Sequence, residues 1–250
     1  MCRFFTGWGL ISLLAVLYSD LQAQKITPGH PLTGESESLR SLIAFTDSVY
    51  GSDIRLVNGR TYQPPHQGAA GHPYFLGQEW MEGSVIACGK QFNSLLLQYD
   101  IFGDHLICIN RSADGSVSRI QLNKEYISGF SIRGRRFVTL SREEISELLH
   151  PHYFEALVID KVSLLTRWEK KFEKADVENF PYGRFSSVNK SICIQKEGKL
   201  IKISNRSSVL KCLADKKPEL KRFMKENDIK GLNLKENELT EIVSYYNKIL

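Results

Sequence analysis

The chain has 250 residues, of which 42% are hydrophobic and 24% charged, with 33 Lys and Arg against 28 Asp and Glu. This apolar content and the modest net charge of +5 exclude a disordered protein and allow one full core. The 18 Gly and 8 Pro follow no period, which excludes collagen-like and low-complexity classes. Only one long apolar run is present, at the very start, so a polytopic membrane protein is excluded as well.

Residues 1–23 are predicted to form a secretory signal peptide. Arg3 precedes an apolar run from Gly9 to Tyr18, and Ala23 is the expected last residue before cleavage. A run of about ten residues is too short to span a bilayer, which needs about 20. We therefore expect an exported protein that is periplasmic, associated with the outer membrane, or secreted.

Four cysteines follow this segment, and none of them forms a CxxC pair. Their spacing therefore gives no support to a zinc ribbon or a thioredoxin-like motif. Cysteines in apolar strand-like runs are commonly buried free thiols, and disulfides are the alternative. The four are Cys88, Cys108, Cys193 and Cys212.

Residues 24–45 form a polar segment rich in Gly, Pro and Ser, and residues 46–250 are predicted to form a single β-rich domain. Short apolar runs alternate with turn pairs, and Asn-Gly and Asp-Gly suit tight hairpins because both central residues need positive φ. Such short runs on tight turns favour an antiparallel meander over βαβ units. The turn pairs are Asn58-Gly59, Gly89-Lys90, Asp114-Gly115, Arg133-Gly134, Asp160-Lys161 and Glu197-Gly198.

Helical patterns occur in the middle of the domain and at its end. Ser141 and Glu144 form a capping box before a short apolar face that Pro151 ends. From about residue 207 the pattern becomes helical, with one helix opened by Pro218 and another that starts at Asn233 and Glu236. The predicted fold is α+β and mainly β: a curved antiparallel β-meander or half-barrel with two C-terminal helices.

The basic excess of the chain lies in one segment. Lys161 to Lys225 holds 17 Lys and Arg against 7 Asp and Glu. Such a segment could contact an envelope protein, a glycan or an anionic lipid surface, and a solvated face is the alternative. Nucleic acid is not an expected partner, because the segment lacks the spaced aromatics of a base-stacking surface.

The only compact group of metal-ligand residue types is Glu147, His150 and His152. Two imidazoles and a carboxylate could hold zinc with one open position, although the HExxH pattern is absent. The alternative is a polar junction between a helix and a strand. No P-loop, GxGxxG or GxSxG motif occurs, so we assign no catalytic residues and expect no cofactor.

Aromatic residues gather around Gly71-His72-Pro73 and in the basic segment. Tyr74, Trp80, Tyr99 and Trp168 are the candidate ligand-binding residues, because exposed aromatic rings bind sugars or line apolar clefts. Aromatics in strands more often pack in the core, which is the alternative for all four.

Several stretches of the chain resemble a family of uncharacterised exported proteins from Gram-negative bacteria. The first is His72–Ile107, with His72-Pro73-Tyr74-Phe75, Gly83, Gly89, Tyr99-Asp100 and Asp104; Ile120–Leu122, Phe130–Ile132 and the tail Leu220–Asn247 follow. The resemblance covers most of the mature chain and implies export and a β-rich fold. It implies no activity, cofactor or catalytic residue.

These patterns together predict an exported binding or assembly module of the cell envelope or the secreted fraction, with a glycan, lipid or protein ligand. The alternative is a secreted hydrolase or metal-binding protein that uses the region of His150 and His152. A lipid carrier would need a cavity lined by strand residues such as Leu95, Leu97, Ile107 and Ile120.

Overall fold

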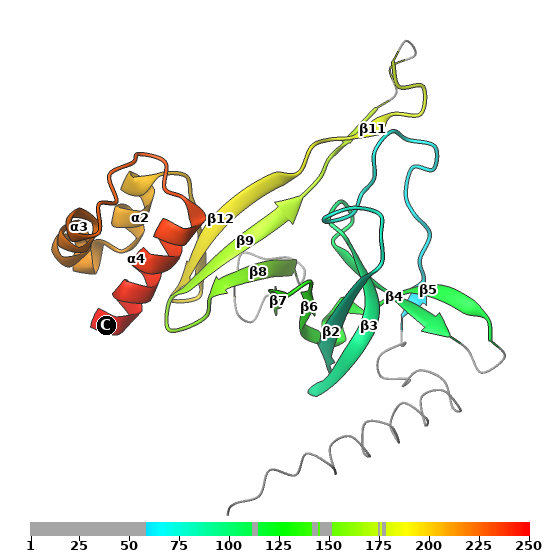
Figure 1. Ribbon diagram of the computed structural model, residues 1–250, viewed down its shortest axis with the longest axis horizontal. Coiled ribbons are helices and arrows are strands. Elements are labelled where there is room, and N and C mark those ends of the chain that lie inside the picture. Colours follow the sequence, from blue (N-terminus) through cyan, green and yellow to red (C-terminus); the bar gives the residue numbers. More distant parts are fainter. Residues whose placement is uncertain (1–58, 112–114, 142–144, 146–151, 175, 177–178) are drawn as a thin grey trace, which may run out of the picture. The chain divides into compact units, whose positions relative to one another are not determined.

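The computed structural model describes residues 59–111, 115–141, 145, 152–174, 176 and 179–250. In these residues the main feature is one antiparallel sheet of eleven strands, in the order β1-β5-β4-β3-β2-β6-β7-β8-β9-β12-β13 (Figure 1). The sheet does not close, since β1 and β13 lie at its two ends. The predicted mainly-β fold, with an open antiparallel sheet and two C-terminal helices, is therefore confirmed.

The strands follow the predicted apolar runs closely. They are β1 (Arg60–Thr61), β2 (Met81–Ala87), β3 (Lys90–Asp100), β4 (His105–Arg111), β5 (Val117–Gln121), β6 (Ile127–Ile132), β7 (Arg135–Leu140), β8 (His152–Val158), β9 (Ser163–Glu169), β12 (Asn189–Lys196) and β13 (Lys199–Ile203). The short strands β10 (Phe172–Glu173) and β11 (Arg184–Phe185) form a separate two-stranded ribbon.

Three of the hairpins turn on pairs in which both residues have positive φ. The pairs are Cys88-Gly89, Arg133-Gly134 and Glu197-Gly198, with φ between 48° and 76°. This conformation matches the twist of the strands on either side, which is why such pairs are favoured in two-residue hairpins. The first turn lies one residue earlier than the sequence predicted.

Two connections of the described chain pass over intervening strands: the one from β1, which pairs with β5, to β2, and the one from β5 to β6. Strands β2 to β5 run outward as a meander, and a single-turn 3-10 helix (Lys124–Tyr126) then leads back to β6 on the other side of β2. From β6 the meander continues through β9. The strand β2 is thus the centre from which both halves of the sheet extend.

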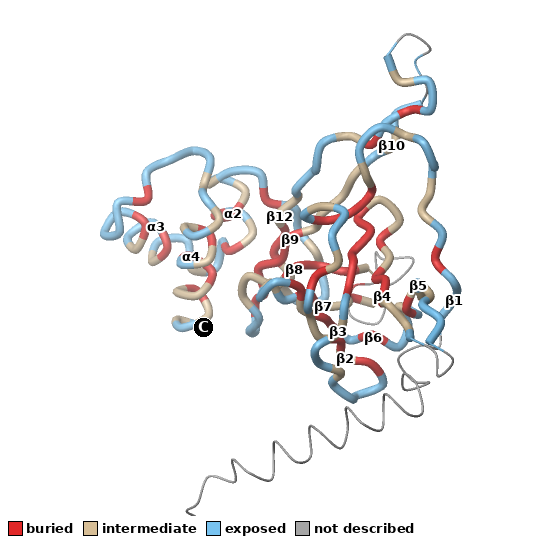
Figure 2. The backbone as a smooth tube through the Cα atoms, turned by 45° about the vertical axis from the view of Figure 1, so that its right-hand side comes forward, coloured by how far each residue is buried: buried red, intermediate tan, exposed pale blue. Residues whose placement is uncertain are grey.

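Aromatic residues on the inner face show that the sheet is strongly curved. Strands β3 and β8 are four positions apart in the sheet, which in a flat sheet would separate them by about 19 Å. Nevertheless, the ring centroids of Tyr99 on β3 and Tyr153 on β8 are 5.7 Å apart, and Phe130 and Phe137 stack between them at 4.6 Å. The sheet therefore curls until opposite strands share one core (Figure 2).

The strand residues that would line the cavity of a lipid carrier are packed in the interior of the protein. Leu97 and Ile107 are completely buried, and Leu95 and Ile120 are partly buried against the same cluster as Leu97. These four side chains therefore pack against the interior of the protein.

The helices α2 (Arg206–Cys212), α3 (Lys217–Glu226) and α4 (Glu236–Ile249) cover the other end of the sheet. Leu220 and Met224 of α3 and Tyr246 of α4 form a second core with Leu164 of β9 and Ile194 of β12. Helix α2 precedes the two expected helices. Helix α4 begins later than predicted: its N-cap is Lys235, whose backbone amide donates to Glu238 Oε2 at 2.6 Å, and Asn233 does not cap it.

Several sequence predictions fall on residues outside the described part. These are the signal peptide, the polar segment 24–45, and most of the helix after Ser141. Of that helix the structure describes only Ile145, whose amide donates to Ser141 O at 3.0 Å and whose side chain is buried. Among the described helices, none has the length and apolar character needed to span a membrane.

The four cysteines after the signal segment are all described, and each is a free thiol. The expectation of a buried thiol is confirmed for Cys108 and is wrong for Cys88, which lies exposed at the first hairpin turn, where the chain reverses outside the core; Cys193 is buried as well. Burial raises the pKa of the Cys108 thiol to about 11, so this thiol remains protonated and unreactive at neutral pH.

Candidate functional sites

A small cleft lies between the segment that precedes β2 and the outer strands of the sheet. Its volume is about 260 Å³. Two of the four predicted aromatic residues line it: Tyr74, which is 6% exposed, and Trp80, which is partly buried. The side chains that matter for its chemistry are His72, Tyr74, Gln78, Trp80, Gln98 and Arg119.

The polar side chains of the cleft are held by specific contacts. The Arg119 guanidinium lies over the Trp80 ring, with 5.8 Å between its carbon and the ring centroid. Gln98, which is 3% exposed, donates from Nε2 to the carbonyl of Gln78 at 2.7 Å and so fixes the segment that carries Trp80. The cleft therefore combines a fixed aromatic ring, amide groups and one cation.

His72 closes one side of this cleft as a neutral ring. Burial and the nearby charge of Lys170 lower the pKa of His72 below its usual 6.5. Its Nδ1 accepts a hydrogen bond from the Tyr74 amide at 3.2 Å, and its carbonyl accepts one from Lys170 Nζ at 2.6 Å. The ring is therefore available for hydrogen bonding without carrying a charge at neutral pH.

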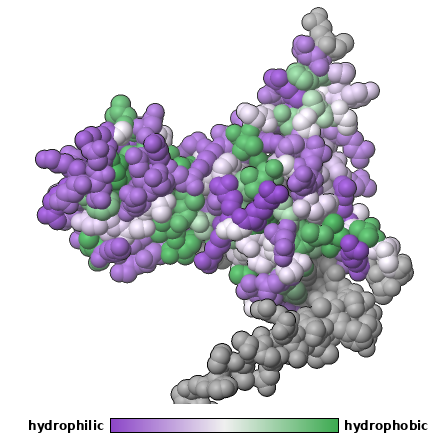
Figure 3. All heavy atoms as spheres, in the orientation of Figure 1, coloured by the Kyte–Doolittle hydropathy of each residue, from purple (hydrophilic) through white to green (hydrophobic). Residues whose placement is uncertain are grey.

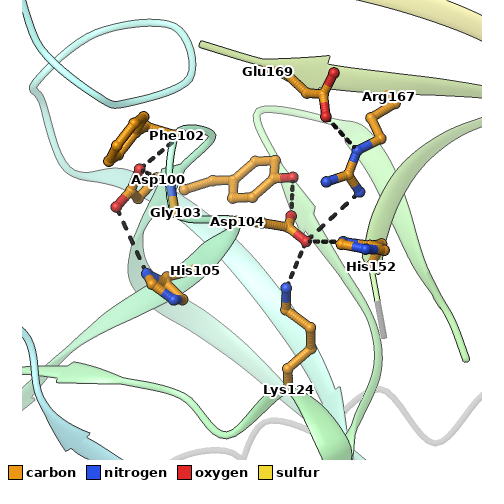
Figure 4. Close-up of polar contacts among 10 residues, drawn as sticks. Asp100, Phe102, Gly103, Asp104, His105, Lys124, His152, Arg167 and Glu169 are labelled. Atoms are coloured by element: carbon orange, nitrogen blue, oxygen red, sulfur yellow. Dashed lines mark hydrogen bonds and ion pairs between the residues drawn. The ribbon is translucent and has the colours of Figure 1, made fainter. Parts of the chain in front are cut away.

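Beneath the cleft, Asp100 anchors the turn between β3 and β4. Its Oδ1 accepts hydrogen bonds from the amides of Phe102 and Gly103, both at 2.9 Å (Figure 4). Its Oδ2 accepts one from the Tyr62 hydroxyl at 3.0 Å. His105 Nδ1 lies 3.8 Å from the same oxygen. Asp100 is 1% exposed, and these donors compensate for its burial.

The other two predicted aromatic residues do not reach the cleft. Tyr99 is 1% exposed in the core and donates from its hydroxyl to Asp104 Oδ1 at 2.7 Å. Trp168 donates from Nε1 to Glu155 Oε2 at 2.7 Å, and the same carboxylate receives two hydrogen bonds from Arg135, at 2.6 and 3.1 Å. Both rings therefore serve packing and the anchoring of buried carboxylates.

Asp104 is the centre of a second polar cluster, which joins distant strands of the curled sheet (Figure 4). Its Oδ2 accepts from Lys124 Nζ at 2.5 Å and from His152 Nδ1 at 2.9 Å, and it lies 3.7 Å from an Arg167 nitrogen. These partners come from the segment after β5, from β8 and from β9. The cluster therefore ties the β3–β4 turn to the opposite end of the same sheet.

The charges of this cluster determine the ionisation of Asp104. Burial alone would raise the pKa of Asp104, but the hydrogen bond from His152 and the charges of Lys124 and Arg167 outweigh it. The pKa is therefore held well below its usual value near 3.9. Next to it, burial and the negative charge of Asp104 raise the pKa of Tyr153, whose buried hydroxyl has no hydrogen-bond partner among the described residues.

The predicted metal-ligand group is only partly described. Glu147 and His150 lie outside the described residues, and His152 is engaged by Asp104. Within the described residues, no group of three or more His, Cys, Asp or Glu side chains is placed to hold a metal ion.

Sequence reasoning missed Arg119 and Gln98 in the cleft and Asp104 in the cluster. The alternation of polar and apolar residues around Ile120 placed Arg119 on the solvent side of a strand, but nothing local linked it to Trp80. Asp104 entered only as one residue of the family resemblance. Apart from Tyr99, its partners are 20 to 63 residues away in the sequence, so no local pattern could reveal the cluster.

No known protein family, no curated protein and no solved structure matches this chain. The function must therefore be argued from the residues of the site themselves.

Proposed function

We propose that this protein is an exported binding module that holds a saccharide in the cleft beside Trp80. The observation that carries the proposal is the combination in one cleft of a fixed indole ring, a guanidinium over that ring, and glutamine and histidine side chains. Indole rings offer an apolar face to sugar C–H groups, while amide, imidazole and guanidinium groups hydrogen-bond to hydroxyls and carboxylates.

The lining favours this ligand class over an apolar one. Sites for lipids and other apolar ligands are lined predominantly by hydrophobic side chains. Here Gln78, Gln98, His72 and Arg119 surround the cleft. Its volume of about 260 Å³ is slightly below the range of about 300–1,000 Å³ that is usual for small-molecule sites, so we expect it to hold one or two sugar rings of a larger glycan.

The export component of the proposal rests on the sequence of residues 1–23. A basic residue, a short apolar core and a small residue at the expected cleavage point support a secretory signal. A binding module for envelope or extracellular glycan would meet its ligand only after export. The N-terminal sequence of the purified mature protein tests this component directly.

The experiment is a glycan array of neutral and acidic oligosaccharides, followed by calorimetric titration of each bound glycan. Trp80→Ala should weaken binding by about 2 kcal/mol, roughly 30-fold, because aromatic anchors carry most of the binding energy of such sites. Arg119→Ala should weaken the binding of acidic glycans more than the binding of neutral ones. Tyr126→Ala and Arg136→Ala, which alter exposed residues outside the cleft, are the controls and should leave affinity unchanged.

A second candidate function is hydrolysis, and the contact between Asp104 and His152 is the observation that favours it. A carboxylate at Nδ1 orients a histidine as a general base. However, the same carboxylate also serves Tyr99, Lys124 and Arg167, which favours a structural role for it. His150→Ala combined with His152→Ala discriminates between the two: a hydrolase would lose its activity, whereas a glycan-binding protein would keep its affinity.

A further inference from the structure

We propose that the helical end of the protein docks onto the surface of an anionic phospholipid bilayer, through the basic face of α3 and the exposed Leu232. This inference goes beyond the saccharide cleft and does not depend on it. It rests on charge, on the pairing of acidic residues and on one exposed apolar side chain.

The positive charge of the chain is concentrated at this end of the sheet. The stretch from Lys196 to Lys235 holds 12 Lys and Arg against 5 Asp and Glu, a larger excess than the +5 of the whole chain. Hydrophilic residues cover most of the visible surface of the helices (Figure 3). An excess of this size attracts anionic surfaces over a distance comparable to the Debye length.

Most of the acidic residues of the helical segment are already paired. Asp215 pairs with Lys196, Glu226 with Arg222, and Asp228 with Lys230. In contrast, no ion pair within the described part of the chain involves the remaining cations of α2 and α3. These are Lys211, Lys217, Lys221 and Lys225, which are all exposed, and Arg206, which is partly buried and donates to the carbonyl of Ile229 at 3.0 Å.

Three of these cations share one face of α3. Lys217, Lys221 and Lys225 recur every four residues, while Leu220 and Met224 are buried against the other helices. Residues at this spacing lie one above another on a helix. The face therefore presents a row of positive charges that the protein itself does not neutralise.

The loop between α3 and α4 adds an apolar side chain. Leu232 is 82% exposed and has Lys230 and Lys235 close by in the sequence. Its carbonyl accepts a hydrogen bond from the Arg206 amide at 2.9 Å, so the loop is fixed at the start of α2. An exposed leucine flanked by lysines suits the boundary between headgroups and acyl chains, where apolar insertion and attraction to anionic lipid act together.

The test is cosedimentation of the exported, processed protein with vesicles of phosphatidylglycerol and phosphatidylcholine in equal parts. We expect binding at 50 mM NaCl that falls steeply by 300 mM, and no binding to pure phosphatidylcholine. The triple variant Lys217→Glu, Lys221→Glu, Lys225→Glu should lose at least about tenfold in affinity, because each cation near such a surface adds about fivefold. Leu232→Ser should lose a few-fold.

Matched controls separate the local surface from net charge and from folding. Lys90→Glu, Arg133→Glu, Arg136→Glu changes net charge equally at exposed sites of the sheet, and Val117→Ser removes an exposed apolar side chain there. Both should bind like wild type, and circular dichroism should show that all variants fold. Equal losses in the two triple variants, or no vesicle binding at 50 mM NaCl, would overturn the proposal. Binding to heparin beads without binding to vesicles would indicate a different polyanion and would overturn it too.

Discussion

At the scale of single residues, the interior of this protein is organised around buried carboxylates. Asp100, Asp104 and Glu155 are each less than 9% exposed, and each is surrounded by hydrogen-bond donors. Their positions in turns and strands were visible in the sequence, but their burial was not, because it depends on donors far away in the chain. The sequence predicted Tyr74 and Trp80 as ligand-binding residues, and the structure brings these two into one cleft and leaves Tyr99 and Trp168 outside it.

Removing the charge of Asp104 should destabilise the protein strongly. In Asp104→Asn, Lys124 and Arg167 would remain partly buried without their shared counter-ion, so we expect a loss of about 3–5 kcal/mol in the free energy of unfolding. Urea denaturation at pH 7 measures this loss. Glu169→Gln removes a partner of Arg167 whose side chain is 42% exposed, and it should cost less than about 1 kcal/mol. Equal effects of the two substitutions would contradict the assigned role of Asp104.

The depressed pKa of Asp104 also predicts a pH dependence of stability. Because the pKa in the folded state lies below the unfolded value near 3.9, the unfolded chain takes up this proton first as the pH falls. The contribution of Asp104 is therefore fully present above about pH 5 and is lost progressively below about pH 4. In denaturation series from pH 5 to pH 3, wild type should lose stability more steeply than Asp104→Asn, by up to about 1.4 kcal/mol per pH unit. Parallel curves would show that Asp104 titrates normally.

At the scale of elements, local chemistry explains most of the fold. Alternating apolar residues and turn pairs predicted the strands, and the buried stripes of α3 and α4 predicted the two C-terminal helices. The start of α4 was predicted wrongly, because Asn233 and Glu236 have the residue types and spacing of a capping box, whereas Lys235, the N-cap in the structure, has no side-chain acceptor that could mark it. The sequence predicted a curved sheet but not which strands the curling brings together, because that depends on aromatic contacts between strands that are not neighbours.

Two glycines of the β6–β7 hairpin should respond differently to alanine. Gly134 has φ +76°, and an added Cβ would meet nothing within 4 Å, so Gly134→Ala should cost only the backbone strain of about 1–2 kcal/mol. A Cβ at Gly129 would lie 2.7 Å from the carbonyl oxygen of Phe137 on the paired strand. Gly129→Ala should therefore push strands β6 and β7 apart and should lower the free energy of unfolding more than Gly134→Ala does. Urea denaturation of both variants checks the order, and the reverse order would contradict it.

At the scale of the whole described domain, one sheet serves two separate cores. The curled part encloses the aromatic core, and the other end carries the helices. Between them, the Glu155 carboxylate binds Arg135 and Trp168, and Lys190 of β12 pairs with Glu236 at the start of α4. The proposed ligand cleft therefore lies against the curled part of the sheet, and the proposed membrane-docking surface lies on the helices at its other end. Substitutions in the cleft should leave vesicle binding unchanged, and substitutions on the docking surface should leave glycan binding unchanged.

The most direct measurement for the saccharide proposal uses the intrinsic fluorescence of Trp80. The chain has three tryptophans, of which Trp8 lies in the predicted signal peptide, so the processed Trp168→Phe variant retains Trp80 alone. Titration of this variant with the glycans that bind on the array should give a saturable change in emission, with the same dissociation constant as calorimetry. Saturable binding by calorimetry without any change in Trp80 emission, or an array without any bound glycan, would contradict the account.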